Sequence, residues 1–150
     1  MKILSSSEKK KIINKLNEQF GISDIPFRML QFGKEKIRVF SGNLPSEKIM
    51  AIEKNLRVEN AGLYIVRIVK DGIRLTIDGT HFFKNNITKG ILRIEDTQTE
   101  IWMKGEDLDI NTDKRYAILK NNNDFLGCGK STGEKIINTI PRERRVNLKI

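Results

Sequence analysis

Residues 116–145, which read YAILKNNNDFLGCGKSTGEKIINTIPRERR, decide the fold of this chain. Apolar and β-branched residues fill two short segments, Tyr116–Lys120 and Phe125–Lys130, and a polar segment rich in asparagine separates them. A third apolar segment, Lys135–Ile140, ends at Pro141. Because Gly, Asn and Pro punctuate the short apolar runs, each run is predicted to be a β-strand.

The same pattern extends upstream of this stretch. Asp71-Gly72 is a two-residue hairpin signal between the predicted strands Leu63–Lys70 and Ile73–Ile77. Two further strands are predicted at Gly90–Ile94 and Glu100–Lys104. Short strands at this spacing, with little helix between them, favour a closed or half-closed β-barrel over a parallel sheet.

The N-terminal residues predict an amphipathic helix. Ser5 and Glu8 have the spacing of a capping box, apolar residues recur at helical spacing as far as Phe20, and Gly21 is a natural helix end. The run of three lysines at 9–11 is assigned to the solvated side of this helix.

Two strands, Phe27–Phe32 and Ile37–Phe40, and a second helix over Glu47–Leu56 are predicted next. The buried face of the second helix is expected to carry Ile49, Ile52 and Leu56. No chemistry is assigned to this half of the chain. The predicted fold class is α+β, with a small N-terminal α/β module over residues 1–60 and a β-pseudobarrel of short mixed strands over residues 61–150.

The charge balance indicates an anionic partner. The chain has 150 residues, with 28 Lys and Arg against 19 Asp and Glu, a net charge of +9 and a pI near 9.7. Nucleic acid is the leading polyanion for such a protein, and a solvated basic surface that binds nothing is the alternative. Cations are concentrated from residue 111 to the C-terminus.

Composition also excludes several classes of protein. No apolar run approaches the roughly 20 residues that span a bilayer, and the N-terminus lacks the order of a signal peptide. Cys128 and His81 are the single cysteine and the single histidine, which excludes an internal disulfide and an ordinary zinc site. We therefore expect a cytoplasmic protein without membrane contact.

Two cofactor-like motifs do not hold. Gly129-Lys130-Ser131 imitates the end of a P-loop, but Asp124 occupies the position where that loop needs glycine. The same glycines imitate the methyl-donor turn of Rossmann-like methyltransferases, yet too few residues follow Gly133 to build the required βα units. Cys128 lies in an apolar strand with no acid or histidine nearby, so we predict a small buried residue and not a nucleophile. We expect no cofactor, no catalytic residue and no metal site.

One resemblance does fit the C-terminal stretch. Leu126-Gly127-Cys128-Gly129-Lys130, Gly133 and the run Lys135–Arg145 resemble the closing strands of a PUA-type RNA-binding domain. The nearest variant is the PUA-like tail of the Nop/Sun family of RNA cytosine-5 methyltransferases. This sequence departs from those tails at Cys128, where they often carry an aromatic residue, and at Glu143, which interrupts the basic cluster.

The resemblance extends upstream to about residue 62. Leu75–Thr80 and Trp102–Leu108 are similar to the first helix-forming segment and the middle strand and turn of archaeal PUA domains. Residues 1–60 are similar in size and outline to the pre-PUA modules of archaeal and ribosome-biogenesis proteins. The resemblance implies that the pseudobarrel is PUA-like and that its ligand is structured RNA.

Residue chemistry and the resemblance together predict an RNA-binding site. Arginine forks onto phosphates and stacks on unpaired bases, and glycine lets an RNA backbone approach closely. His81 and the two phenylalanines after it form a candidate ledge for a base, and plugging one end of the barrel is the alternative role of those rings. The predicted RNA-binding residues are Gly127, Gly129, Lys130, Lys135, Arg142, Arg144, Arg145 and His81.

These observations predict a non-catalytic RNA-binding protein that recognises structured RNA, either tRNA or rRNA. Its expected setting is ribosome biogenesis or the recognition half of a separate RNA-modifying enzyme. The alternative is a protein-interaction module whose basic surface meets an acidic partner in a ribosomal assembly complex.

Overall fold

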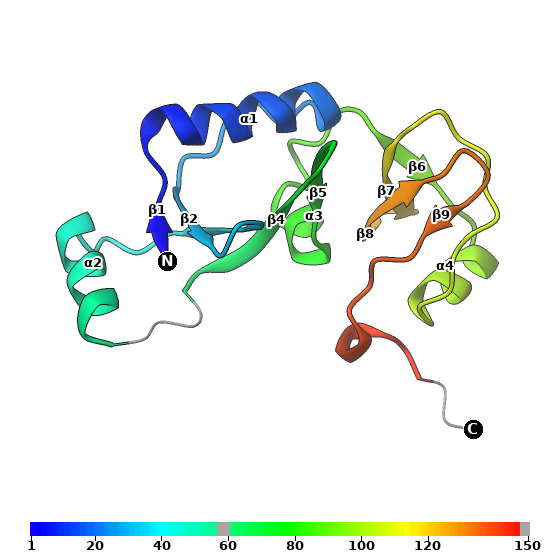
Figure 1. Cartoon of the computed structure of the whole chain (residues 1–150). Coiled ribbons are helices and arrows are strands. Elements are labelled where there is room, and N and C mark those ends of the chain that lie inside the picture. Colours follow the sequence, from blue (N-terminus) through cyan, green and yellow to red (C-terminus); the bar gives the residue numbers. More distant parts are fainter. Residues whose placement is uncertain (57–60, 148–150) are drawn as a thin grey trace.

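The computed structural model describes residues 1–56 and 61–147, which form two lobes, each built on one sheet (Figure 1). The first sheet is antiparallel throughout and has the strand order β1-β2-β3-β4-β5. Its strands are β1 (Lys2–Ile3), β2 (Arg28–Phe32), β3 (Lys36–Phe40), β4 (Leu63–Val69) and β5 (Gly72–Leu75).

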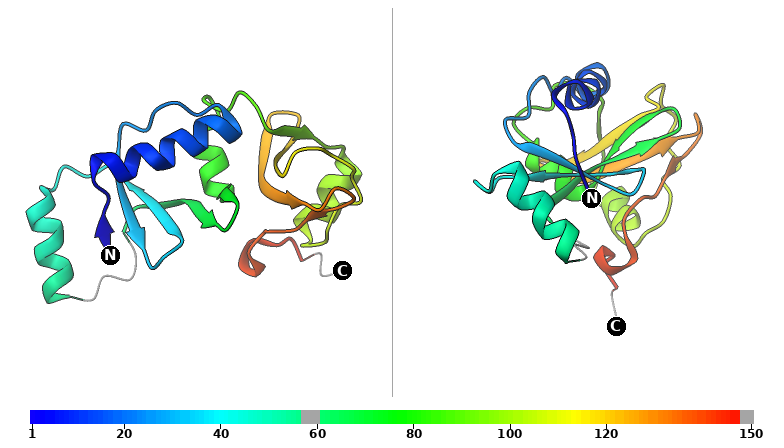
Figure 2. Two further views of the ribbon diagram at one scale, coloured as in Figure 1. Left: turned by 45° about the horizontal axis from the view of Figure 1, so that its top comes forward. Right: turned by 60° about the vertical axis from the view of Figure 1, so that its left-hand side comes forward.

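Helix α1 (Ser6–Phe20) covers one face of this sheet, as Figure 2 shows. Ser5 and Glu8 form the predicted capping box, and Gly21 ends the helix in the left-handed conformation at φ 75°. The buried residues of α1 pack against the apolar face of the sheet, so the amphipathic pattern was sufficient to predict this helix and its orientation.

Helix α2 (Ser46–Asn55) differs from the prediction in its buried face. Ile49 is buried, but Ile52 is 42% exposed and Leu56 is 66% exposed. The helix stands at the outer end of the first sheet, where only part of its length meets other elements (Figure 1). The apolar spacing was read correctly as a helix, whereas the assumption that the whole face is covered was wrong.

The second sheet has the order β6-β7-β8-β9 and curls into a half-barrel, which confirms the α+β class with a pseudobarrel of short mixed strands. Its strands are β6 (Ile91–Arg93), β7 (Tyr116–Asn121), β8 (Asp124–Ser131) and β9 (Ile136–Ile137). The pair β6–β7 is parallel and the other pairs are antiparallel. Strand β9 is shorter than predicted. The backbone N–H of Asn138 donates to Asp107 Oδ1 at 2.8 Å and therefore does not pair with strand β8.

The strand predicted over Glu100–Lys104 is wrong, because these residues lie in and just after helix α4 (Asp96–Met103). Glu95 and Gln98 form a capping box that begins the helix. Trp102 is fully buried, and its Nε1 donates to the carbonyl of Leu126 at 2.7 Å. The short apolar run around Trp102 has no periodicity that separates a strand from a helix, so the cap was the decisive local signal.

The expected division between residues 60 and 61 runs through the first sheet. Strand β4 pairs with β3 from Lys36↔Arg67 to Val39↔Leu63, so both strands belong to one lobe. The change of sheet comes after helix α3 (Ile77–Phe82), and the first lobe therefore consists of β1–β5 with α1–α3.

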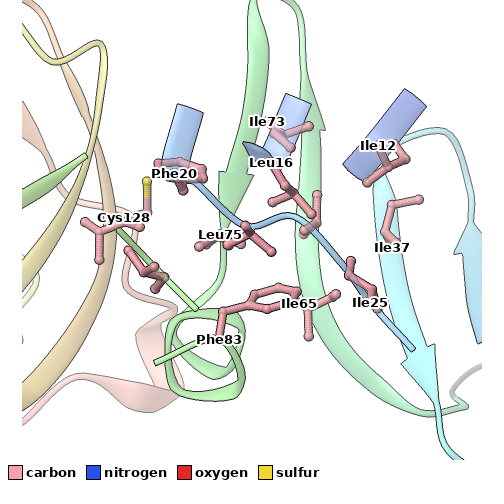
Figure 3. Packing of buried hydrophobic residues seen from close by; sticks show 14 of the residues in the cluster. Ile12, Leu16, Phe20, Ile25, Ile37, Ile65, Ile73, Leu75, Phe83 and Cys128 are labelled. Atoms are coloured by element: carbon pink, nitrogen blue, oxygen red, sulfur yellow. The ribbon is translucent and has the colours of Figure 1, made fainter. Parts of the chain in front are cut away.

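The two lobes share one apolar core (Figure 3). Phe20 and Leu75 of the first lobe lie in the same buried cluster as Cys128 and Ile118 of the second. Backbone bonds add to this junction, since Thr88 N donates to Phe20 O at 3.0 Å. Because this core is continuous, the surfaces where the lobes meet are held by packing and not by a flexible linker. Within the described ranges, no helix has the length and apolar character that crossing a membrane requires.

Candidate nucleic-acid interface

The three predicted C-terminal arginines lie in or next to one short 3-10 helix, η1 (Arg142–Arg144). Pro141 precedes this helix and Arg145 follows it. Arg144 makes an ion pair with Asp78 of α3 at 3.2 Å. Arg145 is half-buried, and its Nε donates to the carbonyl of Ile140 at 3.1 Å. Arg142 is exposed. The three side chains therefore have different roles, and Arg145 is tied into the fold.

Arg144 lines a groove between the lobes, of about 570 Å³, which we call the inter-lobe groove. Three cations of the first sheet, Lys36, Arg67 and Arg74, line it from the other side. Its remaining lining residues are Tyr64, Leu75, Thr76, Ile77, Asp78, Thr139, Pro141 and Glu143. The structure thus brings one predicted arginine together with three cations that are not among the predicted RNA-binding residues.

The charges of the inter-lobe groove are only partly neutralised. Arg67 pairs with Glu35 at 2.7 Å, and Arg144 pairs with Asp78. Among the described residues, Lys36 and Arg74 have no carboxylate within ion-pair distance. Burial raises the pKa of Tyr64, so this phenol is neutral at physiological pH and presents a ring beside the cations.

A pattern in the first sheet explains how these cations reach one face. Lys36 and Arg38 alternate with the buried Ile37 and Val39, so the two cations point away from α1. This alternation was visible in the sequence, but it lies in the half to which no chemistry had been assigned. Its partners on β4 and β5 could not be found without the strand pairing.

Lys130 lies at a different surface, around Asp71. Asp71 receives an ion pair from Arg115 at 3.1 Å and lies 3.9 Å from Lys130 Nζ. The hydroxyl of Tyr116 donates to the same carboxylate. This hydrogen bond, with the two cations, lowers the pKa of Asp71, while burial and the Asp71 carboxylate raise the pKa of Tyr116 to about 12.

This surface is also hollowed, to about 630 Å³, and we call it the Asp71 depression. Its lining residues are Lys15, Glu18, Gln19, Lys70, Asp71, Gly72, Gly90, Lys114, Arg115 and Tyr116. Lys135 belongs to neither hollow and lies 3.8 Å from Asp109. The predicted cations therefore do not form one cluster.

The predicted glycines face the interior. Gly127 and Gly129 are buried, and a Cβ on Gly129 would lie 2.3 Å from Ile136 Cγ2 and 3.0 Å from Trp102 Cη2. A Cβ on Gly127, at φ +90°, would lie 3.0 Å from Ile77 Cγ1. These glycines make room for neighbouring side chains, so close approach of an RNA backbone is not the reason for them.

His81 is exposed at the end of α3, and its Nε2 lies 2.7 Å from the carbonyl of Phe125. The two phenylalanines after it do not form an exposed ledge. Phe83 is 2% exposed and fills the shared core, and Phe82 packs edge-on against Phe27 at 5.7 Å between ring centroids. Phe83 is therefore a core residue of the cluster that the two lobes share, and the predicted role of a plug at one end of the barrel stays a prediction.

Cys128 is fully buried, and burial raises the pKa of its thiol to about 12. The interpretation of this residue as a small buried side chain is confirmed, since a thiol in this state is a poor nucleophile. Asp107 accepts a backbone hydrogen bond from Asn138, as expected of a carboxylate in a turn. The residues that the structure describes contain no group of three or more metal-binding side chains.

Comparison with known proteins identifies the class of the second lobe. Residues 89–146 match the family described as the methyltransferase RsmF PUA domain. The match begins just before β6, where the chain enters the second sheet. The resemblance to the PUA-like tail of Nop/Sun-family proteins is therefore confirmed, and the second lobe is PUA-like.

Two curated relatives, whose matches extend beyond the second lobe, have a more specific name. A protein of Aeromonas hydrophila named ribosomal RNA small subunit methyltransferase F is 23% identical over 142 residues, which are 93% of this chain and 28% of the relative. The protein of the same name in Aeromonas salmonicida is 24% identical over 94 residues, 61% of this chain and 20% of the relative. The chain thus spans 20% to 28% of the length of the curated relatives that it matches.

Proposed function

We propose that this chain binds structured RNA in the inter-lobe groove and has no catalytic role of its own. The observation that carries the proposal is the meeting of Arg144 with Lys36, Arg67 and Arg74 across the groove. Three of these four cations are arginines, which bind phosphate through a planar fork. The shared core holds the two walls in place, so the cations need little reordering when RNA binds.

The ligand we propose is ribosomal RNA of the small subunit, with tRNA as the second choice. The PUA-type match supports RNA as the ligand class, and the names of the two relatives support ribosomal RNA. Because the chain aligns with a limited part of those methyltransferases, we propose that it supplies RNA recognition and acts together with an RNA-modifying enzyme or a ribosomal assembly factor.

Titration of fluorescent small-subunit rRNA fragments and total tRNA at two salt concentrations tests this proposal. Affinity should fall steeply with salt, because each phosphate contact releases counterions. The double variant Arg74→Gln/Arg144→Gln should lose about tenfold or more in affinity and about two units of the salt slope. Binding that is flat with salt, or no stronger than binding to heparin, would overturn the proposal.

The matched control is Lys10→Gln/Lys11→Gln, which removes the same formal charge from exposed positions on α1. Lys9 is kept in this control because its Nζ donates to the carbonyl of Phe27 at 2.8 Å. If both double variants lose the same affinity, RNA binds through diffuse net charge and the groove is not the site.

A further inference from the structure

The face of the first sheet that points away from α1 carries aromatic rings and cations together. Cross-strand partners share a face, and the pairs Phe32↔Lys36, Arg38↔Tyr64 and Lys36↔Arg67 place these side chains on one surface. We call Phe32, Lys36, Arg38 and Tyr64 the aromatic face.

A bulge makes this face possible. Tyr64 and Arg67 are three residues apart, so regular alternation would send them to opposite sides of the sheet. The register shifts between Ile37 and Arg38 and brings both side chains to the same side. Ile65 and Val66, the two residues between them, are both fully buried.

The rings of the aromatic face are held in place by cations. The Arg38 guanidinium lies 5.6 Å from the ring centroid of Phe32 and 5.5 Å from that of Tyr64. Lys36 Nζ lies 5.8 Å from the Tyr64 ring. Arg38 Nη1 also donates to the carbonyl of Gly62 at 2.9 Å. Both rings remain half-buried and not fully covered.

The aromatic face continues into the inter-lobe groove, because Lys36 and Tyr64 line both. Cations that follow a backbone, with rings on which bases stack, are the two elements of a surface for single-stranded nucleic acid. An acidic peptide would use the cations but would leave the rings without a partner. Phosphates with bases match both parts of the surface.

We propose that the aromatic face binds unpaired nucleotides of the RNA, whose bases stack on Tyr64 and Phe32 while their phosphates contact Lys36 and Arg74. This inference rests on the proposed function, and it adds that the bound RNA has an unpaired segment next to its structured part. The groove then holds the structured part, and the first sheet distinguishes an RNA with a free strand from a blunt one.

The test compares a blunt RNA hairpin with the same hairpin extended by a short unpaired tail that carries a fluorescent purine analogue quenched by stacking. Wild-type protein should bind the tailed hairpin about tenfold more tightly and quench the analogue. Phe32→Leu/Tyr64→Leu should abolish both the preference and the quenching. Phe32→Leu alone, at a residue outside the groove lining, should reduce both and should leave the affinity for the blunt hairpin within about twofold. The control Ile101→Ala/Ile137→Ala removes apolar residues of similar exposure, 39% and 37%, from the second lobe and should change neither quantity.

The outcomes separate this inference from the proposed function. If wild-type protein binds neither hairpin, the proposed function is wrong. If it binds both equally, or if the double variant keeps the preference for the tail, RNA binding stands and the aromatic face is not a site for bases. A measurement on wild-type protein covers the case in which the variant does not fold. A thiouridine in the tail should photocrosslink to peptides that contain Phe32 or Tyr64, and crosslinks confined to the second lobe would overturn the inference.

Discussion

The inter-lobe groove and the Asp71 depression are two hollows of similar size, about 570 and 630 Å³, at opposite ends of β5. Each is lined by four cations and two carboxylates, so their formal charges are equal. Three of the four cations in the groove are arginines, whereas three of the four in the depression are lysines. The ring of Tyr64 faces cations, whereas the hydroxyl of Tyr116 is committed to Asp71.

This comparison shows that counting charges does not locate a nucleic-acid site. A lysine is a hydrated point charge, whereas an arginine has a planar fork that matches phosphate and stacks on bases. Carboxylates compete with an incoming phosphate in both hollows, since Asp71 pairs with Arg115 in the depression and Asp78 pairs with Arg144 in the groove. The chemistry of the side chains, and not the net charge, favours the groove.

The largest expected effect comes from a substitution in the core that the lobes share, because this core supports both hollows. Phe20 is fully buried at the end of α1, where Gly90 of the second lobe packs against its ring. Phe20→Ala should lower the free energy of unfolding by about 3–5 kcal/mol, because it leaves a cavity in the core that the lobes share. Urea unfolding followed by circular dichroism measures this loss. A change below about 1 kcal/mol would mean that the lobes do not depend on this junction.

The next effect compares the two hollows by removing two positive charges from each and measuring the affinity for RNA. Lys36→Gln/Arg74→Gln in the groove should weaken RNA binding about tenfold, while Lys70→Gln/Arg115→Gln in the depression should weaken it about twofold or less. Fluorescence anisotropy at low salt measures both. A larger loss from the depression variant would reverse the assignment of the site.

A smaller effect uses the two tyrosines of the chain, one in each hollow. Tyr116 should ionise near its raised pKa of about 12, and Asp71→Asn should lower this value. RNA bound in the groove should raise the pKa of Tyr64 further, because phosphates disfavour a second negative charge, and should leave Tyr116 unchanged. Ultraviolet absorbance of tyrosinate, with and without RNA, follows both groups.

The same pair of residues gives a pH dependence of stability with a definite sign. The folded-state pKa of Tyr116 is raised, so its stabilising contribution is complete below the ordinary tyrosine pKa of 10.0 and is lost as pH rises toward about 12. The pKa of Asp71 is lowered, so its contribution is present above 3.8 and is lost as pH falls through the folded value. Asp71→Asn should flatten the thermal stability profile at both ends, and an unchanged profile would contradict this coupling.

The last prediction is that the chain does not bind a methyl donor or a nucleotide. Calorimetry with S-adenosylmethionine and with ATP should give no binding heat, since Gly127 and Gly129 pack against Ile77, Ile136 and Trp102 and leave no turn for a phosphate or a methyl donor. Saturable binding of either compound would contradict the assignment of Gly127–Gly133 to a strand and turn, and with it the non-catalytic role.

Local signals in the sequence were sufficient for much of the fold. The capping box at Ser5 and the asparagine turn before Asp124 depend on neighbouring residues, and both are present in the structure. The predicted hairpin is also present, but its two-residue loop is Lys70-Asp71 and Gly72 already pairs with Val69. The exposed face of α2 could not be predicted, because burial depends on which element lies opposite. The helix at Trp102 was missed because the three apolar residues Ile101, Trp102 and Met103 are too few to define a period.

The candidate site was predictable only in its second-lobe half. Arg144 was selected from the sequence and lines the groove. Lys36 and Arg74 come from strands that are brought together by the pairing of β3 with β4 and of β4 with β5. The bulge at Ile37 then decides which side chains share a face, and no short window of sequence specifies it.

The burial of Cys128 gives the protein a natural reporter of its own opening. Its thiol lies where the two lobes meet, and no other residue of the chain can react with a thiol reagent. Modification of Cys128 therefore requires the junction between the lobes to open, and the rate of modification measures how often it opens. A ligand that bridges the two lobes should lower the rate of Cys128 modification, whereas a ligand that contacts a single lobe should leave this rate unchanged.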